Sequence, residues 1–115
     1  MSRIFVKEKV LGTHNWPDAF GAVEFLRHEH HHEFNVTVAC DVTHDNRDIE
    51  FIMLRMDVKD FFFECYGCDR WIVKFGSRSC EMIAGELKLW LQQKYVGTEF
   101  TVTVSEDEIQ GGVTK

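Results

Sequence analysis

This sequence of 115 residues contains one proline and no long apolar run. A transmembrane helix needs about 18 or more consecutive apolar residues, and no such stretch is present. The N-terminal segment MSRIFVKEKV also lacks the apolar core of a signal peptide. We therefore expect a protein with no membrane span and no secretion signal.

Positive charge is scarce as well. Lysine and arginine total 13 against 19 acidic residues, which gives a net charge of -6 and an isoelectric point near 5.4. Because nucleic acids and anionic membranes attract basic surfaces, a broad surface for either is not expected. The four cysteines include only one CxxC, at Cys65 and Cys68, too little to predict a redox or metal motif. Without a secretion signal they indicate free thiols in a reducing compartment, and hence a cytoplasmic location.

The histidines are concentrated in one segment of the sequence. Four of the six histidines stand in RHEHHHEFNVTV, residues 27–38. The second half of this segment alternates apolar and polar residues, which is typical of a half-buried strand. Because side chains alternate between the two faces of a strand, His30 and His32 fall on the same inward face as Phe34. Two imidazoles in this arrangement are suitable ligands for zinc.

A histidine-rich segment is also compatible with a solvated strand end, a weak adventitious metal site or an expression tag. The segment is internal and is interrupted by Glu29, which argues against a tag. The remaining histidines, His28, His31 and His44, are expected at the surface.

A third ligand is available from the preceding segment. Residues 3–14 alternate as a strand should, and His14 lies on the apolar face of that pattern. The connection to the strand predicted over 28–42 is short enough for antiparallel pairing. This pairing would bring His14 close to His30 and His32.

The rest of the chain predicts two helices and two more strands. A helical apolar spacing runs from Leu54 to Cys65, and a second helix begins after Ser79, a suitable N-cap. Residues 71–75 are expected as a short extended piece. Alternation then predicts a strand over 100–104, with Glu106 one step further along its apolar face, and a short last strand over 113–115.

This order of two strands, two helices and two strands predicts an α+β fold. Both helices should cover one face of an antiparallel sheet. A chain of this length supports one modest core, so residues 1–115 are expected to form a single domain. A four-stranded sheet this small has open edges, which assembly into a homo-oligomer would cover.

Four segments, in this order, resemble 6-pyruvoyl-tetrahydropterin synthase and its relative 6-carboxytetrahydropterin synthase of queuosine biosynthesis. They are GTHNW around His14; HHHEFNVTV from His30, similar to the family's HGHxYxVxV; SCEMIA from Ser79, similar to TxENLA; and VTVSED from Val102, similar to VxVxET. The resemblance implies the tunnelling fold, in which ββααββ subunits assemble into a barrel. It also implies a trimer or a hexamer of two stacked trimers, with sites at subunit interfaces.

The same resemblance implies a site. Zinc would be held by His14, His30 and His32, and Glu106 would anchor a pterin through paired, charge-assisted hydrogen bonds. The alternative for Glu106 is an exposed strand end among other polar residues. Glu81 is a further candidate substrate-binding residue, or else a first-turn carboxylate favoured by the helix dipole.

Two features of the resembled family have no counterpart. Leu26 occupies the position of its catalytic cysteine, and no histidine follows His44 to match its LDHxxLN proton-relay segment. Cys80, Glu24 and Glu29 are candidate bases, so the catalytic residues are left open. The leading hypothesis is a zinc-dependent lyase acting on 7,8-dihydroneopterin triphosphate. The alternatives are a non-catalytic or repurposed protein that binds a pterin or purine-like ring, and a metal-storing or structural oligomer.

Overall fold

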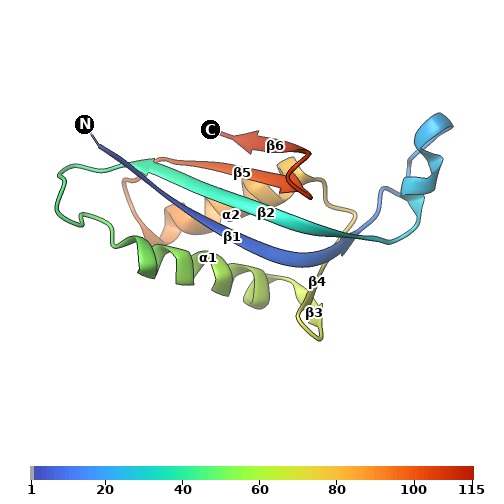
Figure 1. Ribbon diagram of the computed structural model, residues 1–115, viewed down its shortest axis with the longest axis horizontal. Helices are drawn as coiled ribbons and strands as arrows, with labels where there is room; N and C mark the ends of the chain where they lie inside the picture. Colours follow the sequence, from blue (N-terminus) through green and yellow to red (C-terminus); the bar gives the residue numbers. More distant parts are fainter. Residues whose placement is uncertain (1) are drawn as a thin grey trace.

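The computed structural model describes residues 2–115 and consists of one twisted sheet, two α-helices and a short 3-10 helix (Figure 1). Along the chain the elements are β1 (Arg3–His14), η1 (Gly21–Arg27), β2 (His30–Asp41), α1 (Phe51–Cys65), β3 (Gly67–Asp69), β4 (Ile72–Gly76), α2 (Cys80–Lys94), β5 (Phe100–Glu106) and β6 (Gln110–Thr114). The strands lie in the order β3-β4-β1-β2-β5-β6. The predicted α+β class is confirmed.

The sheet is larger than the sequence predicted. Six strands replace the expected four, because β3 and β4 form a hairpin that joins the edge at β1. Strand β4 runs parallel to β1, with Gly12 opposite Val73, so the sheet is mixed and not purely antiparallel. The short extended piece expected over residues 71–75 is confirmed as β4, but its pairing with β1 depends on a contact between segments about half the chain apart.

The boundaries of several elements also differ from the prediction. The second strand begins at His30 and not at residue 28, the first helix begins at Phe51, and the last strand spans Gln110–Thr114 in place of residues 113–115. The connection after β1 contains the 3-10 helix η1. Apart from η1, these differences lie at the ends of elements, where the local sequence pattern is weakest.

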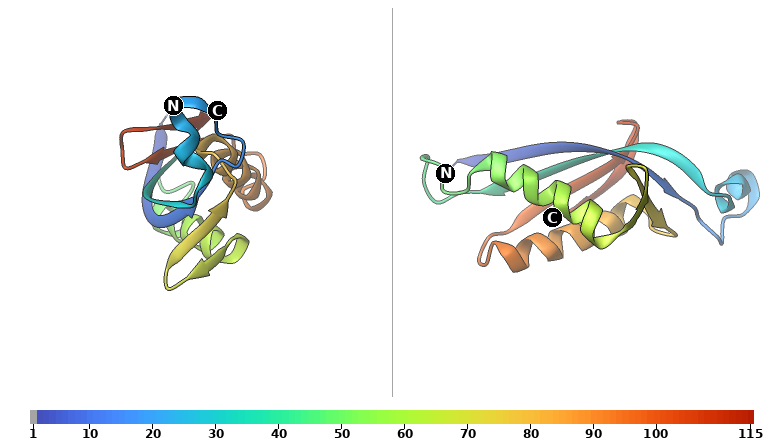
Figure 2. Two further views of the ribbon diagram at one scale, coloured as in Figure 1. Left: turned by 90° about the vertical axis from the view of Figure 1, so that its right-hand side faces the viewer. Right: turned by 90° about the horizontal axis from the view of Figure 1, so that it is seen from below.

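The two helices cover one face of the sheet, as expected, and Figure 2 shows them side by side from below. Helix α1 is capped by Glu50, whose side chain accepts a hydrogen bond from the Ile52 backbone N–H at 2.8 Å. Helix α2 is capped by Ser79, whose hydroxyl accepts from the Met82 backbone N–H at 3.2 Å. Helix α2 buries the whole apolar stripe that the sequence predicted, whereas in α1 the last residue of the predicted stripe, Cys65, is exposed. The buried residues are Leu54, Val58, Phe61 and Phe62 of α1 and Cys80, Ile83, Ala84, Leu87 and Leu91 of α2.

Aromatic residues fill the core beneath one end of the sheet. Phe34 and Phe75 are fully buried, with ring centroids 4.7 Å apart. They close over the backbone of Gly12, where an added Cβ would lie only 2.5 Å from Phe75 Cε2. Glycine at this position therefore lets the two rings pack directly under the end of β1.

The β1–β2 ribbon continues beyond the helices and carries η1 at its far end (Figure 1). No residue of η1 is buried, and Phe20 and Phe25 beside and within it are 69% and 67% exposed. The histidine-rich segment lies where this ribbon leaves the core. None of the helices in the described chain has both the length and the apolar composition needed to cross a bilayer.

Candidate metal centre and adjoining pocket

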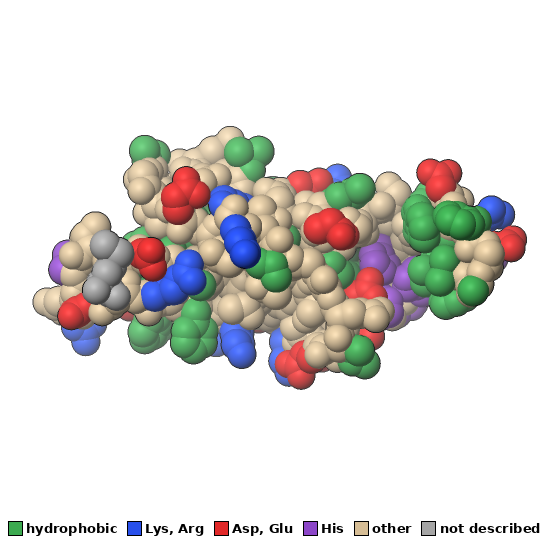
Figure 3. All heavy atoms as spheres, turned by 90° about the horizontal axis from the view of Figure 1, so that it is seen from above, with side chains coloured by type: hydrophobic (Ala, Val, Ile, Leu, Met, Phe, Trp, Pro, Cys, Tyr) green, Lys and Arg blue, Asp and Glu red, His purple; other side chains and the backbone are tan. Residues whose placement is uncertain are grey.

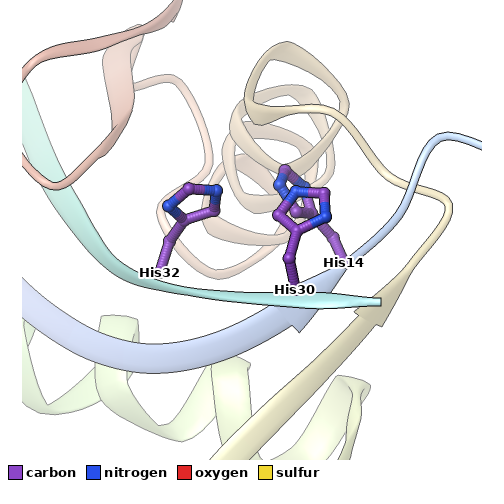
Figure 4. A group of neighbouring side chains, drawn as sticks. All are labelled: His14, His30 and His32. Carbon is purple, nitrogen blue, oxygen red and sulfur yellow. The ribbon is translucent and has the colours of Figure 1, made fainter. Parts of the chain in front are cut away.

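Three histidines meet at the base of the protruding ribbon. The antiparallel register sets His14 opposite His30 and Gly12 opposite His32, so all three rings share one face. Ring centroids are 4.6 Å apart for His14 and His30, 5.3 Å for His14 and His32, and 5.0 Å for His30 and His32. One ring nitrogen from each lies within 4.8 Å of the others (Figure 4). The structure thus brings together the three residues that the strand pattern singled out.

Each ring is oriented by a hydrogen-bond acceptor at Nδ1. His14 Nδ1 lies 2.9 Å from the Arg78 carbonyl, His30 Nδ1 lies 2.8 Å from the His28 carbonyl, and His32 Nδ1 lies 2.7 Å from Asp107 Oδ2. Carbonyl and carboxylate oxygens only accept, so Nδ1 must carry the hydrogen in all three rings. A neutral imidazole with its hydrogen on Nδ1 has its lone pair on Nε2, which is the arrangement that metal-binding histidines adopt.

Glu106 adds a carboxylate to the same centre. Its Oε1 lies 3.0 Å from His14 Nε2, its Oε2 lies 3.6 Å from His32 Nε2, and its side chain is only 17% exposed. With the hydrogen of His14 on Nδ1, a lone pair of Nε2 faces a carboxylate oxygen. Two hydrogen-bond acceptors repel each other at this distance unless a proton or a cation shares the space. The donor set therefore fits a bound cation, and three imidazole nitrogens are a ligand set that zinc prefers.

Burial favours the metal-binding form of His14. The residue is 7% exposed, and burial lowers the pKa of its ring from the ordinary 6.5, although the Arg78 carbonyl and the Glu106 charge both act to raise it. Nearby His30 and His32 add to the lowering. The ring is therefore neutral at neutral pH, as metal binding requires.

A pocket of about 590 Å³ opens beside the three histidines. Its inner end is polar and includes Glu106 and Cys80, whereas its outer end is lined by apolar side chains; these are Trp16, Val23, Phe25, Leu26 and Met82. Figure 3 shows the hydrophobic side chains of the ribbon end next to the histidines. A pocket of this size and mixed character suits a small-molecule ligand.

Of the proposed bases, only Cys80 reaches the pocket wall. Burial, together with the neighbouring Glu106 charge, raises the pKa of its thiol to about 12, so the thiol stays protonated. Glu24 and Glu29 are exposed outside the pocket lining, and Glu24 pairs with Arg27 at 3.4 Å. Leu26 lines the pocket with an apolar side chain.

Glu81 lies at the pocket rim in the first turn of α2. A hydrogen bond with Ser79 lowers the pKa of its carboxyl, as expected for an N-terminal carboxylate on a helix. Both roles predicted for Glu81 are therefore compatible with its position. Cys65 and Cys68 are exposed free thiols outside this pocket.

The sequence reasoning missed three contacts that shape the site. Asp107 accepts a hydrogen bond from His32 Nδ1, and the Arg78 carbonyl accepts one from His14 Nδ1. The Gln110 amide donates to Glu106 Oε2 at 3.2 Å. In the sequence, Asp107 is one of several polar residues around Glu106, a pattern that is also compatible with an exposed strand end. A carboxylate directly after Glu106 was the one available signal, and nothing local connected it to a histidine 75 residues away.

An α+β domain whose β1–β2 ribbon carries three converging histidines has the architecture of the tunnelling fold. The solved structures agree with this class. Two variants of Plasmodium vivax 6-pyruvoyltetrahydropterin synthase, in which a catalytic glutamate is replaced by cysteine or by alanine, each superpose with a TM-score of 0.69. Each match covers 98% of this chain and 96% of the Plasmodium chain at 18% identity.

This similarity shows that the chain has the fold of a 6-pyruvoyltetrahydropterin synthase over nearly its whole length. The fold implied by the four sequence segments is therefore confirmed. No protein-family model and no curated protein sequence matches the chain.

Proposed function

We propose that this protein is a zinc-dependent lyase of the 6-pyruvoyl- or 6-carboxytetrahydropterin synthase type, acting on the side chain of 7,8-dihydroneopterin triphosphate. The observation that carries the proposal is the convergence of His14, His30 and His32 with Glu106 at the inner end of a ligand-sized pocket. The fold shared with the Plasmodium enzyme supports it.

His14, His30 and His32 would hold the metal through Nε2 and leave a further coordination position open towards the pocket. When bound, Zn²⁺ supplies the electrophilic chemistry that polarises a hydroxyl or carbonyl oxygen of the substrate and stabilises enolate-like charge. The three acceptors at Nδ1 fix the rings before the metal arrives, so little reorganisation is needed.

Glu106 would bind the ring of the substrate. A carboxylate matches the paired N–H donors at the edge of a pterin, and such charge-assisted pairs are stronger than neutral hydrogen bonds. The Gln110 amide already donates to Glu106 Oε2 and keeps the carboxylate in the pocket. Glu81 at the rim is a second carboxylate within the same lining.

Proton transfer would fall to Cys80, the candidate base that lines the pocket. The raised pKa keeps its thiol protonated, so Cys80 would hold a proton at Sγ in the resting state. In the Plasmodium enzyme a glutamate is a catalytic residue, which makes a carboxylate a candidate base here as well. Glu24 and Glu29, on the segment that carries Leu26, are the alternative carboxylates.

A second function is favoured by Leu26 and by the lack of a relay histidine after His44. In this case the protein binds a pterin or purine-like ring without converting it. Both functions predict ligand binding that depends on Glu106, but only the first predicts turnover.

The deciding experiment measures metal content and turnover together. We expect one zinc per chain by elemental analysis, lost in His30→Ala and His32→Ala. Zinc-loaded protein incubated with 7,8-dihydroneopterin triphosphate under anaerobic, reducing conditions should yield a new pterin by chromatography. Binding that is lost in Glu106→Gln, without any new product, would replace the lyase by the ring-binding function. Zinc without affinity for either ring would refute both.

We further propose a cytoplasmic homo-oligomer, a trimer or hexamer, with queuosine biosynthesis as its setting. The support is an uncovered sheet face with Phe5 62% and Leu11 56% exposed, together with the exposed apolar residues around η1. These surfaces would be covered in a barrel of subunits. Sedimentation velocity at micromolar concentration would detect the assembly, and a monomer would contradict it.

A further inference from the structure

The hairpin between β5 and β6 has an unusual backbone. Asp107 and Glu108 are consecutive residues with positive φ, 53° and 61°, and neither is glycine. The left-handed region is costly for residues with a side chain, and tight hairpins normally place Gly, Asn or Asp there. Glycine adopts this conformation at less cost than either aspartate or glutamate, so the contacts of Asp107 and Glu108 decide what their side chains contribute.

Asp107 makes three hydrogen bonds that account for an aspartate at this position. Its Oδ2 accepts from His32 Nδ1 at 2.7 Å, and its Oδ1 accepts from the Glu33 backbone N–H at 2.9 Å. Its own backbone N–H donates to the Glu33 carbonyl at 2.8 Å. The hairpin is thus tied to β2 at His32 and at the next residue. Figure 4 shows His32 on the side of the centre that faces this hairpin.

Glu108 has the same backbone conformation, but it is not among the hydrogen-bond or ion-pair partners of the three histidines. It is therefore a natural control, because the two residues share the strain and differ in the contact. The other two rings are held by neutral backbone carbonyls of Arg78 and His28, so His32 is the one ring of the three that faces a carboxylate at Nδ1.

From this geometry we propose that Asp107 is the positioning residue of the metal centre. It fixes the ring of His32 with Nε2 towards the centre, and by accepting a hydrogen bond from Nδ1–H its carboxylate makes Nε2 a stronger metal ligand. The left-handed backbone is the conformation that brings the carboxylate to the ring. This inference rests on the proposed metal site but not on the lyase reaction, because it concerns metal affinity alone.

The test compares Asp107→Gly, Asp107→Asn and Glu108→Gly. Zinc affinity is measured by competition with a chromogenic chelator, and the ligand geometry by the visible spectrum of the cobalt(II) form. We expect Asp107→Gly to weaken zinc binding by about 10- to 100-fold, the usual effect of removing a carboxylate that orients a ligating histidine. Asp107→Asn keeps an acceptor and loses the charge, so its loss should be smaller. Glu108→Gly should bind zinc like the parent protein.

Thermal melting of the metal-free proteins separates positioning from folding. Glu108→Gly should melt at the same temperature as the parent or higher, because glycine relieves the backbone. Unchanged zinc affinity in Asp107→Gly, or an equal loss in both glycine variants, would overturn the proposal. If Asp107→Gly does not fold, Asp107→Asn with parental affinity and spectrum would overturn it as well. A parent protein that binds no zinc, or a His32→Ala variant that binds normally, would refute the metal site itself.

Discussion

Gly12 offers the sharpest test of how the core supports the histidines. In Gly12→Ala the new Cβ would lie 2.5 and 2.8 Å from Cε2 and Cδ2 of Phe75 and 3.0 Å from Cδ2 of Phe34. Both rings are fully buried, so neither can swing into solvent. The phenylalanines or strand β1 must therefore shift by several tenths of an ångström.

Two opposing effects set the change in the free energy of unfolding of Gly12→Ala. Overpacking a tight core costs about 1–3 kcal/mol, and replacing glycine stabilises by about 0.4–1 kcal/mol through the unfolded chain. We expect a net loss of about 1–2 kcal/mol, or roughly 4–8 °C in Tm for a domain of this size. Gly85→Ala is the matched control, since its Cβ would meet no atom within 4 Å and lies within α2. It should stabilise by about 0.5–1 kcal/mol.

The same shift should reach the metal centre. The Phe34 ring centroid lies 5.1 Å from that of His14 and 5.8 Å from that of His32, so Phe34 forms the floor under two of the three rings. Zinc affinity should therefore fall in Gly12→Ala and stay unchanged in Gly85→Ala. Circular-dichroism melts with excess chelator give stability, and chelator competition gives affinity. A Gly12→Ala protein as stable as its parent would show that the packing argument is wrong.

Three further predictions use other parts of the structure. Because burial holds the pKa of His14 below 6.5, the unfolded chain binds more protons than the folded one as pH falls through this value. Metal-free stability should therefore decline below about pH 6.5, and His14→Gln should flatten that decline in urea titrations. Tyr66→Phe removes the hydroxyl that donates to Glu86, the carboxylate that accepts hydrogen bonds from Arg78, and Tyr95→Phe removes a similar hydrogen bond to Asp57. Each variant should lower the free energy of unfolding by about 0.5–1.5 kcal/mol in thermal melts. Only Tyr66→Phe should also weaken zinc binding, because the Arg78 carbonyl orients His14. Leu26→Cys places a thiol in the pocket lining and should raise the turnover rate measured by chromatography, whereas Val23→Cys, also on the pocket wall, should not.

Much of the site could be predicted because a strand repeats every two residues. Once His30 and His32 share a face with Phe34, the pairing of two neighbouring strands places His14 opposite them. Glu106 follows from the same reasoning, because it lies one step past Val104 on the apolar face and pairs with Phe34. The alternation within each strand therefore predicts that these residues share one face of the sheet, even though they are far apart in the sequence.

The parts that escaped prediction depend on contacts without a local pattern. An extended piece over residues 71–75 was predictable, but the parallel pairing of β4 with β1 was not. This pairing precedes the turn in which the Arg78 carbonyl lies 2.9 Å from His14 Nδ1. Asp107 is an ordinary polar residue in the sequence until the hairpin turns it towards His32. Backbone acceptors and long-range carboxylates leave no periodic trace in a sequence, so the orientation of a ligand is harder to foresee than its identity.

The ribbon that carries η1 gives the centre a mechanical consequence. An ion gripped by residue 14 on one strand and residues 30 and 32 on the other would act as a cross-link that closes the loop between them. Cross-links of this kind remove conformational freedom from the unfolded chain. Loading the ion should therefore slow amide hydrogen exchange throughout the projecting arm, far more than in the layer of helices below.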